Sequence, residues 1–159
     1  MRQSCPLRFT FALLVALPSL GAAQTSHAHL GGRFTYDATN EMTGLGVQLS
    51  APIGARLELY PSADFMFPDV GSRWVGNIDL KYRFPAAERP LWFYVGAGVG
   101  FDRRSFRDVH DTEAGLNLFT GLEPLRGAVH PFMEVRLTAA DETRVGLAVG
   151  LNITLNGNR

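Results

Sequence analysis

The chain has 159 residues, the length of one domain, and its 15 basic residues balance 15 acidic residues to a formal net charge of +0 at pH 7. This balance argues against a nucleic-acid-binding protein, because such a protein carries a basic excess that contacts phosphates. The single cysteine, Cys5, excludes a disulfide within the chain.

The beginning of the chain predicts a secretory signal peptide that is removed from the mature protein. Two arginines precede an apolar run, Phe9–Leu17, and small residues follow the run up to Ala23. The alternative is a membrane anchor, but a spanning helix takes about 20 apolar residues and this run is shorter. We therefore divide the chain into a signal peptide, residues 1–23, cleaved after Ala23, and one domain, residues 24–159.

Segments of the predicted domain alternate between apolar and polar side chains, and each is bounded by Pro, Gly or polar residues. The most regular is the segment 91–101, whose odd positions are all apolar and whose even positions end in Gly96, Gly98 and Gly100. Its length suits a tilted strand that crosses a bilayer, which needs about 9–11 residues. The predicted strands are 30–36, 44–51, 56–67, 73–84, 91–101, 113–122, 132–137 and 144–155.

The connections between the predicted strands alternate in character. Those after the second, fourth and sixth strands are compact and contain Pro or Gly, whereas those after the first, third, fifth and seventh are more polar. The longest is the segment 102–112, which is rich in Arg and Asp. Compact turns at one end and polar loops at the other are typical of outer-membrane barrels. The pattern predicts an all-β fold, an eight-stranded antiparallel up-and-down transmembrane β-barrel.

Aromatic residues on the apolar face gather at the strand ends, and the middle of that face is aliphatic. Two aromatic girdles around an aliphatic band are typical of a barrel in lipid, because amphipathic rings favour both interfaces. The alternative is a soluble sandwich or barrel with an apolar core and a solvated charged face. The predicted girdles are Phe34, Tyr36, Phe65, Phe67, Trp74 and Phe101 at the polar-loop end, and Tyr82, Phe84 and Phe93 at the compact-turn end.

The polar face carries acids and bases in similar number, as expected for a narrow lumen filled by ion pairs. Glu58 should lie opposite Lys81, or opposite Arg83 if the register slips by two residues. Glycines beside the large charged residues would let the lumen close-pack, so we expect a filled barrel and not a porin. The predicted lumen network is Arg33, Arg56, Glu58, Asp64, Asp79, Lys81, Arg83, Glu134 and Arg136.

The segments Tyr94–Phe101, Gly115–Glu123 and Pro131–Arg136 resemble the fifth, sixth and seventh strands of the small OmpA/OmpX-type outer-membrane barrels. The resemblance extends over residues 29–155 and implies an integral protein of the bacterial outer membrane. Such barrels commonly end on an aromatic residue that is read during assembly, whereas this sequence ends at Arg159.

These features favour a non-enzymatic barrel with a structural or surface-interaction role, in contact with outer-membrane lipid and without a cofactor or metal. One alternative is a lipid-modifying enzyme on the same scaffold, because Ser105, Asp108, His110 and Asp111 share a loop, although their spacing matches no hydrolase motif. Another is a soluble periplasmic barrel that carries a small apolar ligand.

The loop 102–112 is the part of the sequence with the strongest functional character, since function in rigid scaffolds tends to sit on loops. Its arginines would lie at the height of lipid headgroups, and Arg holds phosphate by paired hydrogen bonds. Neutralisation of these arginines by the aspartates of the same loop is the alternative. The predicted contacts to lipopolysaccharide phosphates are Arg73, Arg103, Arg104 and Arg107.

Overall fold

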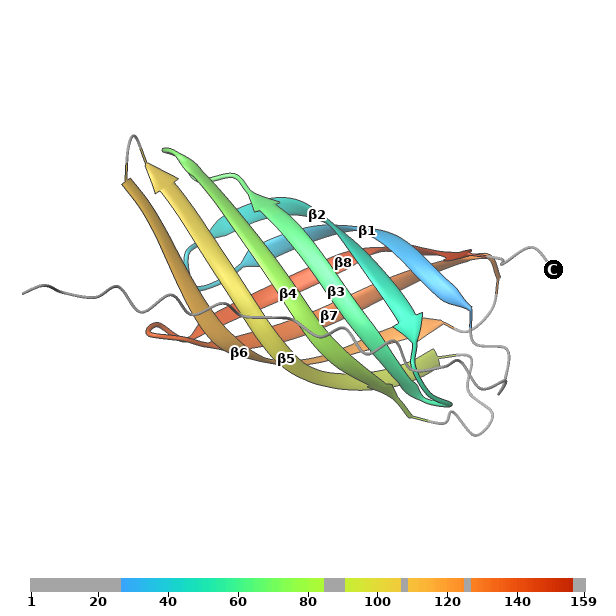
Figure 1. The fold of residues 1–159 in the computed structure, drawn as a ribbon. Coiled ribbons are helices and arrows are strands. Elements are labelled where there is room, and N and C mark those ends of the chain that lie inside the picture. Colours follow the sequence, from blue (N-terminus) through green and yellow to red (C-terminus); the bar gives the residue numbers. More distant parts are fainter. Residues whose placement is uncertain (1–26, 85–90, 107–108, 125–126, 156–159) are drawn as a thin grey trace, which may run out of the picture.

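The computed structural model describes residues 27–84, 91–106, 109–124 and 127–155 (Figure 1). In these residues eight antiparallel strands form one closed barrel in which each strand pairs with its sequence neighbours and β1 pairs with β8. No helix of the described residues is long and apolar enough to cross a membrane. The strands are β1 Ala28–Asp37, β2 Met42–Pro52, β3 Leu57–Met66, β4 Ser72–Arg83, β5 Leu91–Phe106, β6 Val109–Pro124, β7 Val129–Ala139 and β8 Arg144–Leu155.

The barrel has two distinct ends. The start of β1 and the ends of β2, β4, β6 and β8 lie at one end, which we call the terminal end. The ends of β1, β3, β5 and β7 lie at the other, which we call the hairpin end. Figure 1 shows the strands inclined to the barrel axis, with β5 and β6 reaching far out at the hairpin end. Inclined strands are what closing a sheet into a barrel requires.

The predicted long loop 102–112 is largely a β-hairpin, and this corrects the sequence analysis. β5 continues to Phe106 and β6 begins at Val109, with Asp102 opposite Glu113 and Ser105 opposite His110. The charged residues belong to the strands because the two-residue alternation continues through them: Asp102 is buried while Arg103 is exposed. The polar composition of the segment 102–112 therefore reflects its position at the mouth of the barrel and does not indicate a loop.

The faces of the sheet are inverted relative to a water-soluble protein. Lys81 is 0% exposed and Asp79 is 1% exposed, whereas Leu118 is 59% exposed and Leu116 is 66% exposed. In a strand successive side chains point to opposite faces, so this alternation separates an interior of polar residues from an apolar outer surface. The arrangement contradicts the alternative of a soluble sandwich with an apolar core.

Glycines on the inner face give space to large neighbours. A Cβ atom on Gly98 would lie 2.3 Å from Asp79 Oδ1, and one on Gly96 would lie 2.1 Å from the ring of Phe119. Both distances are far below van der Waals contact. The space allows Phe119 to pack against Tyr60, with ring centroids 5.5 Å apart, in the one apolar cluster of the described interior.

We expect Gly98→Ala to destabilise the barrel by about 1–3 kcal/mol, because the added methyl group overpacks the interior beside Asp79. Gly76→Ala is the matched control, since a Cβ atom at Gly76 has no neighbour within 4 Å. Urea unfolding in liposomes measures both. Equal stability of the two variants would show that the interior is not close-packed at Gly98.

Candidate functional site

The charged residues in the interior of the described barrel form three clusters along its axis. A terminal cluster contains Glu58, Lys81, Arg83 and Glu123. A central cluster contains Arg33, Asp64, Asp79, Glu134 and Arg136. A hairpin cluster contains Asp37, Arg73, Asp102, Arg104, Glu113 and Arg144.

The terminal cluster contains the pair expected from the sequence. Glu58 lies opposite Lys81 in the β3–β4 register, with Lys81 Nζ 3.5 Å from Glu58 Oε2, and Arg83 Nη1 lies 3.0 Å from Glu58 Oε1. Glu58 therefore contacts both candidate bases. Glu123 on β6 also contacts both, at 3.2 Å from Lys81 and 3.3 Å from Arg83. Two acids and two bases thus neutralise one another within a low-dielectric interior.

The central cluster contains the shortest described contacts across the lumen. Arg136 Nη1 on β7 donates to Asp79 Oδ2 on β4 at 2.6 Å, and Arg136 Nη2 donates to Glu134 Oε1 at 2.9 Å. Arg33 on β1 pairs with Asp64 on β3, and its Nε donates to Asp64 Oδ1 at 2.7 Å. The Arg136–Asp79 and Arg33–Asp64 contacts join strands that are not neighbours, so they bridge the lumen and fill its centre.

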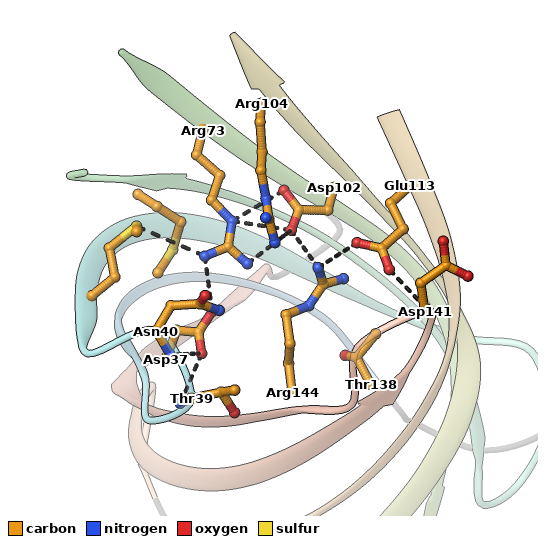
Figure 2. Close-up of polar contacts among 12 residues, drawn as sticks. Asp37, Thr39, Asn40, Arg73, Asp102, Arg104, Glu113, Thr138, Asp141 and Arg144 are labelled. Atoms are coloured by element: carbon orange, nitrogen blue, oxygen red, sulfur yellow. Dashed lines mark hydrogen bonds and ion pairs between the residues drawn. The ribbon is translucent and has the colours of Figure 1, made fainter. Parts of the chain in front are cut away.

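The hairpin cluster ties five strands together (Figure 2). Asp102 on β5 accepts from Arg73 on β4 at 2.8 Å and lies 2.7 Å from Arg144 Nη1 on β8. Arg73 Nη1 also donates to Asp37 on β1 at 2.9 Å, and Arg144 Nη1 donates to Glu113 on β6 at 2.8 Å. Figure 2 shows these side chains converging inside the barrel wall, so ion pairs bridge the lumen towards this end.

Two predicted site residues occupy other places than expected. Arg73, predicted at lipid phosphates, points into the lumen and is 4% exposed, because it precedes Trp74 and neighbouring residues of a strand face opposite sides. Arg56, predicted in the lumen network, lies in the turn before β3 and is exposed. Among the described residues Arg56 makes no ion pair.

The other arginines predicted to contact lipid phosphates differ in where the structure places them. Arg103 is exposed and lies opposite Trp74 in the β4–β5 register, on the outer face. Arg104 faces the mouth of the barrel, where its Nη2 lies 3.4 Å from Asp102. Arg107 lies outside the described residues. Only Arg103 of the described candidates therefore combines exposure with a place on the outer face.

The predicted girdle residues lie on the outer face near the two ends, and several pack in pairs. Phe65 contacts Trp74 with ring centroids 4.8 Å apart at the hairpin end, and Phe84 contacts Phe93 at 5.4 Å at the terminal end. The structure places all of them there: Phe34, Tyr36, Phe65, Phe67, Trp74 and Phe101 towards the hairpin end, and Tyr82, Phe84 and Phe93 towards the terminal end.

The sequence analysis missed five cluster members, Asp37, Asp102, Glu123, Glu113 and Arg144. The first three fall just beyond the predicted strand ends, which were set where charged residues begin. Glu123, for example, follows Leu122, yet β6 continues to Pro124 and Glu123 is buried. The signal that could have found them is the two-residue alternation, continued past the apolar stretch into the charged one.

The described members of the set considered for hydrolysis, Ser105, His110 and Asp111, do not form a triad. Ser105 Oγ and His110 Nδ1 lie 3.0 Å apart on the exposed hairpin, but among the described residues no carboxylate hydrogen-bonds to His110. Asp111 lies opposite Arg104, and Asp108 lies outside the described residues. No cluster of three or more His, Cys, Asp or Glu in the described ranges is arranged to hold a metal ion.

The geometry defines a class of protein: an eight-stranded barrel with an apolar exterior and an ion-paired interior. No family model and no curated protein sequence matches the chain. Solved structures with this fold include the N-terminal β-barrel domain of Pseudomonas aeruginosa OprF, with a TM-score of 0.61 and 17% identity over 79% of this chain and 96% of that one. The chain therefore has the fold of the small outer-membrane β-barrels.

Two further structures share the fold. Ail, the attachment invasion locus protein of Yersinia pestis, aligns with a TM-score of 0.57 and 11% identity over 81% of this chain and 97% of that one. Neisserial surface protein A aligns with a TM-score of 0.53 and 14% identity over 81% of this chain and 95% of that one. The three likenesses concern the arrangement of the strands.

We expect Asp102→Asn to destabilise the barrel by about 3–5 kcal/mol, because it removes the acid shared by Arg73 and Arg144 and leaves the hairpin cluster with one buried positive charge in excess. Asp141→Asn, at an exposed position of the β7–β8 turn, is the control. Urea unfolding in liposomes measures the difference. A loss of under 1 kcal/mol at Asp102 would show that the hairpin cluster is solvated.

Proposed function

We propose that the protein is an integral barrel of the bacterial outer membrane, without enzymatic activity, whose role is structural or lies in contacts at the cell surface. The observation that carries the proposal is the uncharged, aliphatic middle of the outer face between two aromatic ends. Lipid is the solvent that such a surface requires, whereas in water it would form an apolar patch that promotes aggregation.

The interior supports a structural role over that of a pore. An eight-stranded barrel is just wide enough for side chains to fill. Here Tyr60, Lys81 and Tyr94 are almost fully buried, and Lys81 Nζ lies 4.3 Å from the centroid of the Tyr94 ring. These residues, with the central cluster, occupy the cross-section that a channel would need.

A charge on the outer face tests the membrane assignment. Leu118 lies near the middle of β6, and we expect Leu118→Arg to lower the free energy of unfolding in bilayers by about 2–4 kcal/mol. Thr112→Arg, on the same strand and the same face but near the β5–β6 turn, should cost much less. Equal stability of the two variants in liposomes would contradict burial of Leu118 in lipid.

The β5–β6 hairpin supports a role at the cell surface. β6 pairs with β7 only from Leu116 onwards, so in the described chain Val109–Gly115 pairs with β5 on one side and with no strand on the other. A free strand edge offers backbone hydrogen-bonding groups to an extended segment of a partner. We therefore propose that the hairpin end points outward and that this edge takes part in protein contacts.

The orientation can be measured with single cysteines, because Cys5 lies in the segment that we expect to be removed. In intact cells a membrane-impermeant maleimide should label Thr112→Cys at the hairpin end. It should label Ala55→Cys, in the exposed turn at the terminal end, only after the outer membrane is opened. Labelling of Ala55→Cys alone in intact cells would reverse the proposed orientation.

We also propose that outer-membrane lipid phosphates, including those of lipopolysaccharide, contact Arg103. Its exposure beside the aromatic residue Trp74 supports this, since headgroups lie at the height of such rings. Arg103→Gln should remove the extra stability that lipopolysaccharide confers in liposomes and leave stability in phosphatidylcholine unchanged. If lipopolysaccharide does not stabilise the wild-type protein, or stabilises Arg103→Gln equally, the contact is refuted.

A further inference from the structure

A cavity of about 390 Å³ opens at the terminal end of the barrel. The terminal cluster contributes Glu58, Arg83 and Glu123 to it, and strand ends and turns form its walls and rim. The wall and rim residues used below are His29, Arg56, Trp92, His130 and Thr154. The proposed surface role makes no use of this cavity.

The hydrogen-bond acceptors at the base of the cavity are already occupied. Glu123 Oε1 accepts from Asn152 Nδ2 at 2.8 Å, and its Oε2 accepts from Lys81 and Arg83. Glu58 accepts from Ser50 and pairs with the same two bases. The two carboxylates are thus neutralised and have little capacity left to bind a cationic ligand.

Donors remain. The Arg56 guanidinium and the Trp92 indole N–H have no hydrogen-bond partner among the described residues, and both side chains line the cavity. Since Lys81 and Arg83 balance the two acids, Arg56 is the excess positive charge among the described Lys, Arg, Asp and Glu residues at the cavity. Trp92 adds a half-buried aromatic surface, with the Arg83 guanidinium carbon 5.4 Å from its ring centroid. Charge and donors together favour an anion.

A chain of hydrogen bonds orients the histidines. His130 Nδ1 lies 2.9 Å from the Pro124 carbonyl oxygen, which can only accept, so Nδ1 carries the proton. In the neutral ring His130 Nε2 then accepts from the Thr154 hydroxyl at 3.1 Å, and that oxygen accepts from His29 Nδ1 at 3.4 Å. The neutral His29 is left with a lone pair on Nε2, which suits a hydroxyl donor of a ligand.

We propose that the terminal cavity binds a small organic anion that also carries hydroxyl groups, of the class of sugar acids and sugar phosphates. Arg56 holds the carboxylate or phosphate by paired hydrogen bonds, Trp92 contacts the ring of the ligand, and His29 accepts from a hydroxyl group. Carboxylate and phosphate share this chemistry, and the titration described next distinguishes between them.

The chain has two tryptophans, so Trp74→Phe leaves Trp92 as the only fluorescent indole, placed in the cavity. This variant, folded in detergent, is titrated with glucuronate and with glucose 6-phosphate at constant ionic strength. We expect a saturable change in Trp92 fluorescence with at least one of them and none with glucose, which lacks the charge. The stronger of the two responses identifies the anionic group.

Arg56→Gln in this background should weaken binding by about tenfold or more, the loss expected for one charge-assisted contact. Asp141→Asn, which removes an exposed charge at the opposite end, should leave binding unchanged. Arg56 lies in an exposed turn outside the ion-pair clusters, and heat-modifiable migration on gels verifies that each variant is folded. No saturable response to either anion, an equal response to glucose, or unchanged affinity in Arg56→Gln would overturn the proposal.

Discussion

The structure depends on the pairing of charges that the closed barrel removes from water. An isolated buried ion is very costly, and in this protein acids and bases reach across the lumen to one another. Asp102 is shared by Arg73 and Arg144, and Lys81 is shared by two acids. Because the partners come from different strands, the same contacts that neutralise the charges also hold the barrel closed.

Close packing of the lumen is the second condition for this fold, and it depends on the pairing of the buried charges. Several inner side chains lie against a facing Gly, as Phe119 does at Gly96, Tyr94 at Gly121 and Asp79 at Gly98. The interior is thus matched in charge and in volume at the same positions. The outer side chains are not enclosed by facing strands, and between the aromatic ends they are mainly aliphatic.

The alternation of side chains predicted the fold because its period of two is a local property that does not depend on distant contacts. It also placed Glu58 opposite Lys81 or Arg83, and of these two registers the β3–β4 hairpin has the one with Lys81. Strand ends were predicted less well. Asp102 and Glu123 are charged, and at a barrel mouth charge does not end a strand, because the lumen accepts it.

Contacts across the lumen could not be predicted at all. Arg136 and Asp79 lie on strands that are not neighbours, and only the curvature of the closed barrel brings their side chains within 2.6 Å. The claim that paired charges across the lumen stabilise the barrel is tested most directly by a double-mutant cycle of Asp79→Asn and Arg136→Gln in liposomes. It predicts a coupling energy of about 1.5–3 kcal/mol. Losses that add within about 0.5 kcal/mol would show that the two charges do not depend on one another, and would contradict it.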